Sequence, residues 1–112
     1  MHEFSIVTNI VDIAIGSADQ NGLNSVSCVE IDVGKASGVE PSAMEFAWES
    51  ARKDTILENA RLVMHFIPLC LQCQTCGMQY EPEEMYKPCP ACGEINARII
   101  TGKELRVVAI ES

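Results

Sequence analysis

The chain opens with a helical pattern of apolar and polar positions. Apolar residues recur at spacings of three and four from Phe4 to about Ala18, opposite a polar stripe, which predicts an amphipathic helix. Glu3 falls in the first turn, where the helix dipole favours a carboxylate. The segment 20–22, Gln-Asn-Gly, is a typical helix end. The predicted apolar face comprises Phe4, Val7, Ile10, Val11 and Ala14.

A second helix and four strands are predicted beyond this point. Pro41 suits the first position of a helix, and Trp48 lies on its apolar face, which predicts a core position. Alternating or β-branched runs predict strands at 29–33, 60–67, 95–100 and 105–110. We therefore expect an α+β fold, with two helices covering a small mixed sheet. A cysteine-rich lobe is inserted before the last two strands and is expected to project as a separate tip.

Two cysteine motifs dominate the inserted lobe. Residues 73–77 read Cys-Gln-Thr-Cys-Gly, and residues 89–93 read Cys-Pro-Ala-Cys-Gly. Two residues between cysteines let one tight turn aim both sulfurs at one point, and the following glycine can adopt a positive φ. Two such knuckles supply four thiolates, the ligand set of a structural zinc site resembling a zinc ribbon. The predicted ligands are Cys73, Cys76, Cys89 and Cys92.

Other interpretations of the cysteines remain open at this stage. Disulfides are disfavoured because the sequence shows no signal peptide, so we expect a reducing cytoplasm. Rubredoxin-like iron is the main rival to zinc. Cys70 and Cys73 also form a CxxC pair, but we favour Cys73 with Cys76 because Gly77 follows them as Gly93 follows the second pair. Cys28, in a strand-like run, is interpreted as a buried apolar residue.

Charge and length narrow the classes of partner. The 112 residues contain 16 acidic and 8 basic side chains, for a formal net charge of −8. This balance disfavours nucleic acid and anionic membranes, and it suits metal cations or a basic protein surface. No apolar run reaches the roughly 18 residues needed to span a bilayer. There is no nucleophile–base arrangement and no phosphate-binding glycine motif, so we expect no enzyme.

The chain has two histidines, and only one suggests a binding role. His65 lies in a predicted strand and is interpreted as a surface residue. His2 differs because a free α-amine, the next amide nitrogen and the imidazole of residue 2 can close adjacent chelate rings, with the Glu3 amide nitrogen in reach for a fourth bond. Ni(II) and Cu(II) favour nitrogen ligands in a plane. Considered alone, a histidine near a terminus is more often a frayed surface residue.

The whole chain resembles the HypA/HybF family of nickel-insertion accessory proteins for [NiFe]-hydrogenase. The resemblance rests on a combination of segments rather than on any single one. It includes both knuckles, Val33-Gly34 before Pro41, and the four segments Met1-His2-Glu3, Phe46-Ala47-Trp48-Glu49, Glu58-Asn59-Ala60-Arg61-Leu62 and Gly102-Lys103-Glu104-Leu105, followed by Ile110-Glu111.

The resemblance implies a nickel metallochaperone with two lobes. By it, Met1, His2 and Glu3 bind Ni(II) as transferred cargo, and the four knuckle cysteines hold structural Zn(II). The implied partners are a HypB-type GTPase and the hydrogenase large subunit; some relatives also serve urease. We place the nickel lobe at 1–68 plus 102–112 and the zinc lobe at 69–101, in a monomer or homodimer. Some relatives carry histidines beside their knuckles, linked to rearrangement of the zinc site; Gly77 and Gly93 follow the second cysteines here, so such coupling is not expected.

Two other functions are weighed against this one. A rubredoxin-like electron carrier would bind iron and show reversible one-electron chemistry, but it does not need the long first lobe. A zinc-ribbon module for nucleic acid would need a basic face. Segment 73–93 instead contains one basic residue, Lys87, and three acidic ones, Glu81, Glu83 and Glu84.

Overall fold

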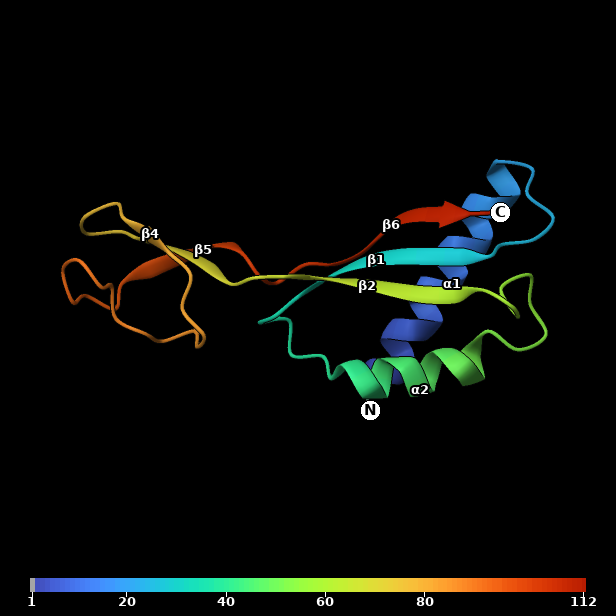
Figure 1. The fold of residues 1–112 in the computed structure, drawn as a ribbon, viewed down its shortest axis with the longest axis horizontal. Coiled ribbons are helices and arrows are strands. Elements are labelled where there is room, and N and C mark those ends of the chain that lie inside the picture. Colours follow the sequence, from blue (N-terminus) through green and yellow to red (C-terminus); the bar gives the residue numbers. More distant parts are fainter. Residues whose placement is uncertain (1) are drawn as a thin grey trace. The chain divides into compact units, whose positions relative to one another are not determined.

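A computed structural model describes residues 2–112, with side chains from residue 3 onward. It contains two helices and six strands (Figure 1). The helices are α1 (His2–Gln20) and α2 (Pro41–Ala51), and the strands are β1 (Cys28–Gly34), β2 (Arg61–Ile67), β3 (Cys70–Cys73), β4 (Gln79–Tyr80), β5 (Ala97–Thr101) and β6 (Leu105–Glu111). Two separate three-stranded sheets form, which confirms the α+β class predicted from the sequence.

Helix α1 buries most of the face that its pattern predicts. Its buried side chains are Val7, Ile10, Val11, Ala14 and Ala18. The helix ends at a glycine in the left-handed region: Gly22 has φ +68°, and the Leu23 N–H returns to the Ala18 carbonyl at 2.9 Å. Phe4 departs from the prediction, because 48% of it is exposed. It lies in the first turn of α1, and the buried side chains of this helix begin only at Val7.

Helix α2 is fixed at both ends. Its N-cap is Glu40, whose carboxylate accepts from the Ser42 N–H at 3.3 Å, and Pro41 follows at the first helical position. Near the other end, the Trp48 Nε1–H donates to the Ala60 carbonyl at 3.1 Å. Trp48 is 1% exposed, so the predicted core position is confirmed. The two helices pack against each other.

The larger sheet has the order β2–β1–β6 and contains both strand orientations. The Arg61 N–H donates to the Ser27 carbonyl and the Lys35 N–H to the Ile67 carbonyl, so β1 and β2 run in the same direction. They are joined by α2, the usual connection between parallel strands. The Ser27 N–H donates to the Glu111 carbonyl, and the Gly34 N–H to that of Glu104, so β6 is antiparallel to β1.

The smaller sheet carries the cysteine motifs and has the order β4–β3–β5. Leu71 in β3 lies opposite Tyr80 in β4 and Ile99 in β5, and both pairings are antiparallel. The strands predicted at 60–67 and 95–100 lie on either side of the inserted lobe, so the sequence allows both to join one sheet. They do not, since β5 pairs with β3, whereas β2 belongs to the larger sheet. Periodicity could not reveal this, because it identifies strands but not their neighbours.

The chain divides into two compact units. Unit 1 comprises 1–32, 39–65 and 106–112, and unit 2 comprises 33–38 and 66–105. Within unit 2, the backbone of segment 33–38 lies very close to the rest of the unit at two glycines, Gly34 and Gly102. A Cβ on Gly34 would clash with the Gly102 carbonyl, and a Cβ on Gly102, at φ +117°, would lie 2.7 Å from the Leu69 Cα. Among the described helices, none combines the length and apolar character that crossing a bilayer requires.

Candidate metal centre

The two cysteine motifs adopt matching backbone conformations. Gly77 and Gly93 have φ values of +80° and +78°, as the sequence predicts for the residue after each pair. The Gly77 N–H donates to the Cys73 carbonyl at 2.9 Å, and the Gly93 N–H to the Cys89 carbonyl at 2.8 Å. Each first cysteine also donates its own N–H across the turn, Cys73 to Met78 at 2.9 Å and Cys89 to Glu94 at 2.8 Å. The knuckles are therefore two copies of one turn.

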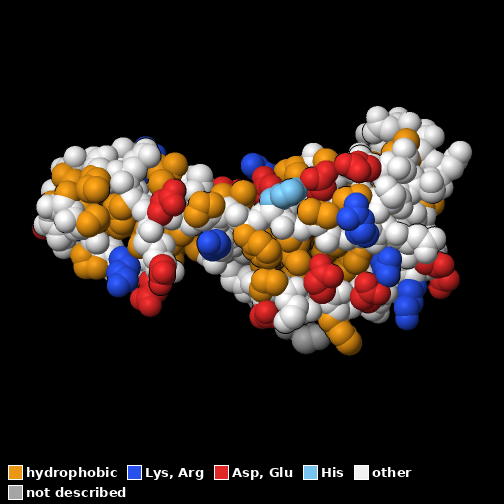
Figure 2. Space-filling model, in the orientation of Figure 1, with side chains coloured by type: hydrophobic (Ala, Val, Ile, Leu, Met, Phe, Trp, Pro, Cys, Tyr) orange, Lys and Arg blue, Asp and Glu red, His pale blue; other side chains and the backbone are white. Residues whose placement is uncertain are grey.

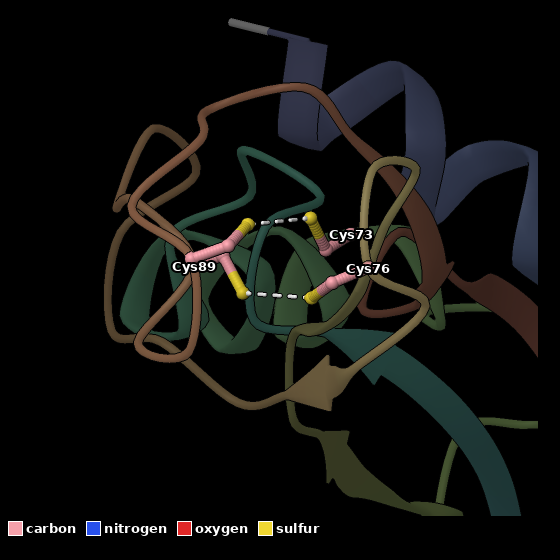
Figure 3. Close-up of side chains that lie close together, drawn as sticks. Cys73, Cys76 and Cys89 are labelled. Atoms are coloured by element: carbon pink, nitrogen blue, oxygen red, sulfur yellow. Dashed lines mark hydrogen bonds between the residues drawn. The ribbon is translucent and has the colours of Figure 1, made fainter.

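Four sulfur atoms meet where the knuckles face each other (Figure 3). All four lie within 4.8 Å of one another. Across the knuckles, the Cys73 and Cys92 sulfurs are 3.5 Å apart, and those of Cys76 and Cys89 are 3.6 Å apart. A tetrahedral site with Zn–S bonds of about 2.3 Å places its sulfurs roughly 3.8 Å apart. The cluster therefore has the donor set and the dimensions of a four-thiolate metal site, and its separations are too long for disulfides.

Backbone N–H groups aim at the sulfurs and stabilise negative charge there. The Cys76 N–H, bonded to the Cys73 sulfur, lowers the pKa of that thiol to about 6, against the effect of burial. The Glu94 N–H also acts to lower the pKa of Cys92, but its sulfur contacts, first that to Cys73, raise that pKa to about 12. In the absence of a cation, neighbouring thiolates repel each other, so protons stay on some of the sulfurs. A divalent cation removes this conflict, because it lets all four deprotonate.

Burial follows the same twofold pattern. Cys73 and Cys89, the first residue of each knuckle, are 1% and 2% exposed, whereas Cys76 and Cys92 are exposed. All four members of the cluster are cysteines, so their sulfurs would fill a tetrahedral coordination sphere and leave no position for a water or substrate ligand. Four thiolates without an open position are typical of structural sites rather than catalytic ones.

Neither of the two remaining cysteines belongs to the cluster. Cys70 lies in β3 opposite Thr101, and a register irregularity follows it at Leu71. Cys28 lies buried in β1, where burial raises the pKa of its thiol. The pair aimed at the second knuckle is thus Cys73 with Cys76.

The predicted nickel residues are only partly within the described region. Met1 lies outside the described residues, as does the side chain of His2. The backbone of His2 begins α1, and Glu3 follows in its first turn. The Glu3 carboxylate accepts from the Glu40 N–H at 3.2 Å. This contact ties the start of α1 to the N-cap of α2, a pairing that the sequence did not predict.

His65 has a partner that no local sequence signal revealed. Its Nε2 lies 2.8 Å from Glu30 Oε1, across the neighbouring strands β2 and β1. About half of the His65 side chain is exposed, and no further His, Cys, Asp or Glu of the described residues completes a metal-binding group there. The interpretation of His65 as a surface residue agrees with this position.

Comparison with known proteins gives one consistent result. The family model described as "Hydrogenase/urease nickel incorporation, metallochaperone, hypA" matches residues 1–112. The chain belongs to the HypA family. A hydrogenase maturation factor HypA from Geobacter metallireducens (strain ATCC 53774 / DSM 7210 / GS-15) is 41% identical over 111 residues, covering 99% of this chain and 98% of that protein. The corresponding factor from Aquifex aeolicus (strain VF5) is 37% identical, covering 99% and 96%.

Solved HypA structures share the fold. A solution structure of a HypA protein aligns with a TM-score of 0.74 at 26% identity, covering 99% of this chain and 95% of the other. The solution structure of the nickel metallochaperone HypA from Helicobacter pylori aligns with a TM-score of 0.70 at 24% identity, covering 97% and 95%. At that identity the second comparison shows the fold alone.

HypA membership confirms the resemblance inferred from the sequence segments. The chain is a nickel metallochaperone of hydrogenase maturation, carrying a four-cysteine metal site of the zinc type. It is not an enzyme, because this family handles a metal rather than catalysing a reaction. The match to the HypA family covers residues 1–112, so this assignment is favoured over the electron-carrier and nucleic-acid interpretations.

Proposed function

We propose that the chain binds Ni(II) at its first three residues and delivers the ion to a hydrogenase large subunit, working with a HypB-type GTPase in the cytoplasm. Unit 1 is then the nickel lobe and unit 2 the zinc lobe. The proposed nickel residues are Met1, His2 and Glu3, and the proposed zinc ligands are Cys73, Cys76, Cys89 and Cys92. The observation that carries this proposal is the Met-His-Glu opening in a chain matched end to end by the HypA family.

The position of residues 2 and 3 in α1 supports amide coordination. The first four N–H groups of an α-helix have no carbonyl one turn earlier to which they can donate. His2 and Glu3 open α1, so binding nickel through their amide nitrogens costs the helix none of its i to i−4 hydrogen bonds. The Glu3 side chain, held by the Glu40 N–H, anchors this turn against α2. Nitrogen donors in a plane suit Ni(II).

Zinc in the cysteine cluster supplies shape rather than chemistry in this proposal. The donor set is four sulfurs, and against the effect of burial, N–H groups of the knuckles lower the pKa of Cys73 and of Cys89. Unit 2 buries few apolar side chains, so the metal supplies cross-links that its core does not. Reduced cysteines of this kind persist in a cytoplasm.

The nickel site is tested by titration of the untagged protein. In calorimetry, the wild type should bind one Ni(II), and both His2→Ala and a Gly-Ser extension before Met1 should abolish stoichiometric binding, because each removes a nitrogen ligand. His65→Ala is the matched control, since it removes the other histidine, and it should bind nickel like the wild type. Zinc content should stay at one per chain throughout. Stoichiometric nickel binding by both altered proteins contradicts the proposed site.

A further inference from the structure

An apolar groove lies on unit 1, at the starts of both helices. It encloses about 400 Å³. Two phenylalanines and two alanines make up most of its lining, and the two remaining residues are polar. The lining residues are Glu3, Phe4, Ser42, Ala43, Phe46 and Ala47. One wall therefore belongs to the first turn of α1 and the other to the first two turns of α2.

The two phenylalanines are exposed far beyond what packing within the unit requires. Phe46 is 80% exposed and Phe4 is 48% exposed. Large apolar side chains that line a hollow with their surface in water are typical of interaction sites, because a partner gains free energy by covering them. Figure 2 shows hydrophobic side chains exposed beside acidic ones on the lower part of the unit.

The surface around the groove is acidic. Neither helix contains a lysine or an arginine. Glu3 lines the groove and Glu40 caps α2 beside it. Glu45 lies one turn beyond Ser42 on the same helix, outside the lining, on a surface that it shares with Arg52 and Arg61. The Glu40 carboxylate accepts from the Ser42 hydroxyl at 2.6 Å, and this hydrogen bond lowers the pKa of Glu40. An occupant of this groove therefore meets an apolar floor with a negative rim.

We propose that this groove is the docking site for the protein that receives nickel from the chain. The receiving protein inserts an apolar side chain against Phe4 and Phe46, and its lysine or arginine residues meet the carboxylates of the rim. This inference rests on the proposed function, because Glu3 both lines the groove and belongs to the proposed nickel site. A protein seated there is in contact with Glu3, one of the three proposed nickel residues.

A second copy of the chain is a poorer occupant. In a symmetric pair, the same patch faces itself. Glu3, Glu40 and Glu45 of one copy would then approach the same three carboxylates of the other, and like charges brought together across an interface cost free energy. A basic partner turns the same carboxylates into favourable contacts and is drawn to them at long range.

Binding to the purified precursor of the nickel-receiving hydrogenase subunit from the same organism tests the apolar part. Phe46→Ala should weaken binding on the order of tenfold or more, the loss expected when a central aromatic anchor is removed. Ile13→Ala is the matched control. Ile13 is 49% exposed and lies nine residues from Phe4, which is two and a half turns of α1, so it is on the opposite side of the helix. It should bind within about twofold of the wild type. Equal binding by Phe46→Ala and the wild type overturns the proposal.

Charge reversal tests the rim. Glu45→Lys should weaken binding of the same precursor and reduce its dependence on salt, because one attractive contact becomes repulsive. Asp19→Lys makes the same change in charge near the far end of α1 and should have a much smaller effect. Equal losses for the two variants would show a diffuse response to net charge and would overturn the assignment of the rim.

Two further measurements separate this inference from its foundation. Phe46→Ala should bind nickel like the wild type. If the wild type itself binds no nickel, the proposed function is wrong. If Phe46→Ala binds the precursor like the wild type, the proposed docking site is wrong. Sedimentation should show the same state of association for the wild type and Phe46→Ala. If Phe46→Ala abolishes self-association, or if it weakens binding to the GTPase but not to the hydrogenase precursor, the groove has another occupant and the proposal is overturned.

Discussion

Unit 1 buries apolar side chains from both helices and the larger sheet, whereas unit 2 buries few apolar side chains besides Cys73 and Cys89. In unit 1, Trp48, Met44, Ile31 and Leu57 are at most 1% exposed. In unit 2, Ile95 is 70% exposed and Tyr86 is 85% exposed, and the buried side chains are Val33, Leu69, Leu71, Cys73 and Cys89. The comparison teaches that an apolar core stabilises unit 1, whereas unit 2 has little core and carries a four-cysteine metal site instead.

Removal of zinc should have the largest effect on this comparison. Cys89→Ser or a strong chelator should unfold unit 2, because apparent binding free energies of structural zinc reach about 10–16 kcal/mol and no large core replaces them. Two-dimensional NMR should show loss of dispersed signals from residues 73–93, while the α1 and α2 signals and the far-ultraviolet helical signal persist.

Cys70→Ser provides the matched control for that experiment. It replaces a cysteine of the same unit that lies outside the sulfur cluster, so zinc should remain bound. Retention of unit 2 signals after complete zinc removal would show that its own contacts suffice and would end the distinction between the units.

Truncation of the core tryptophan should have the next largest effect, now confined to unit 1. Trp48→Ala should lower the free energy of unfolding by about 3–5 kcal/mol, because it leaves a cavity in the core and removes the hydrogen bond to the Ala60 carbonyl. Urea denaturation followed by circular dichroism measures the loss. Phe46→Ala, on the same helix and 80% exposed, should change stability by about 0.5 kcal/mol or less.

The zinc content of Trp48→Ala sharpens the comparison further. It should remain at one per chain, because the tryptophan belongs to the other unit. Zinc loss in parallel with unfolding of unit 1 would show that the two units fold as one.

The smallest effect should come from the exposed pair on the larger sheet. His65 and Glu30 approach to 2.8 Å, but 48% and 26% of their side chains are exposed. Solvent screens such a pair, so His65→Ala should change the free energy of unfolding by less than about 1 kcal/mol. Chemical denaturation at pH 6 and pH 8 measures the change. A loss as large as that from Trp48→Ala would mean that the sheet surface, rather than the core, stabilises unit 1.

Residue types and spacings alone determined the helices, the larger strands and the cysteine ligand set. Helices α1 and α2 and strand β1 follow local periodicity, since each contributes buried apolar side chains to a core. Strands β2 and β6 lie where they were predicted, although neither contains a fully buried residue. The knuckles were equally predictable, because the CxxCG motif determines a local turn whose conformation depends little on the rest of the chain. Segments Cys70–Cys73 and Gln79–Tyr80, the short strands β3 and β4, were not predicted, because so few residues carry no period.

Only the tertiary structure decided which elements are neighbours and which apolar residues lie in water. It paired β5 with β3, placed segment 33–38 in unit 2, joined Glu3 to Glu40, and set Glu30 beside His65. It also left Phe4 and Phe46 exposed at one groove, although Phe4 lies on the apolar stripe of α1. The physical reason is that a periodic pattern fixes which side of an element is apolar, whereas long-range packing fixes where along its length the core ends.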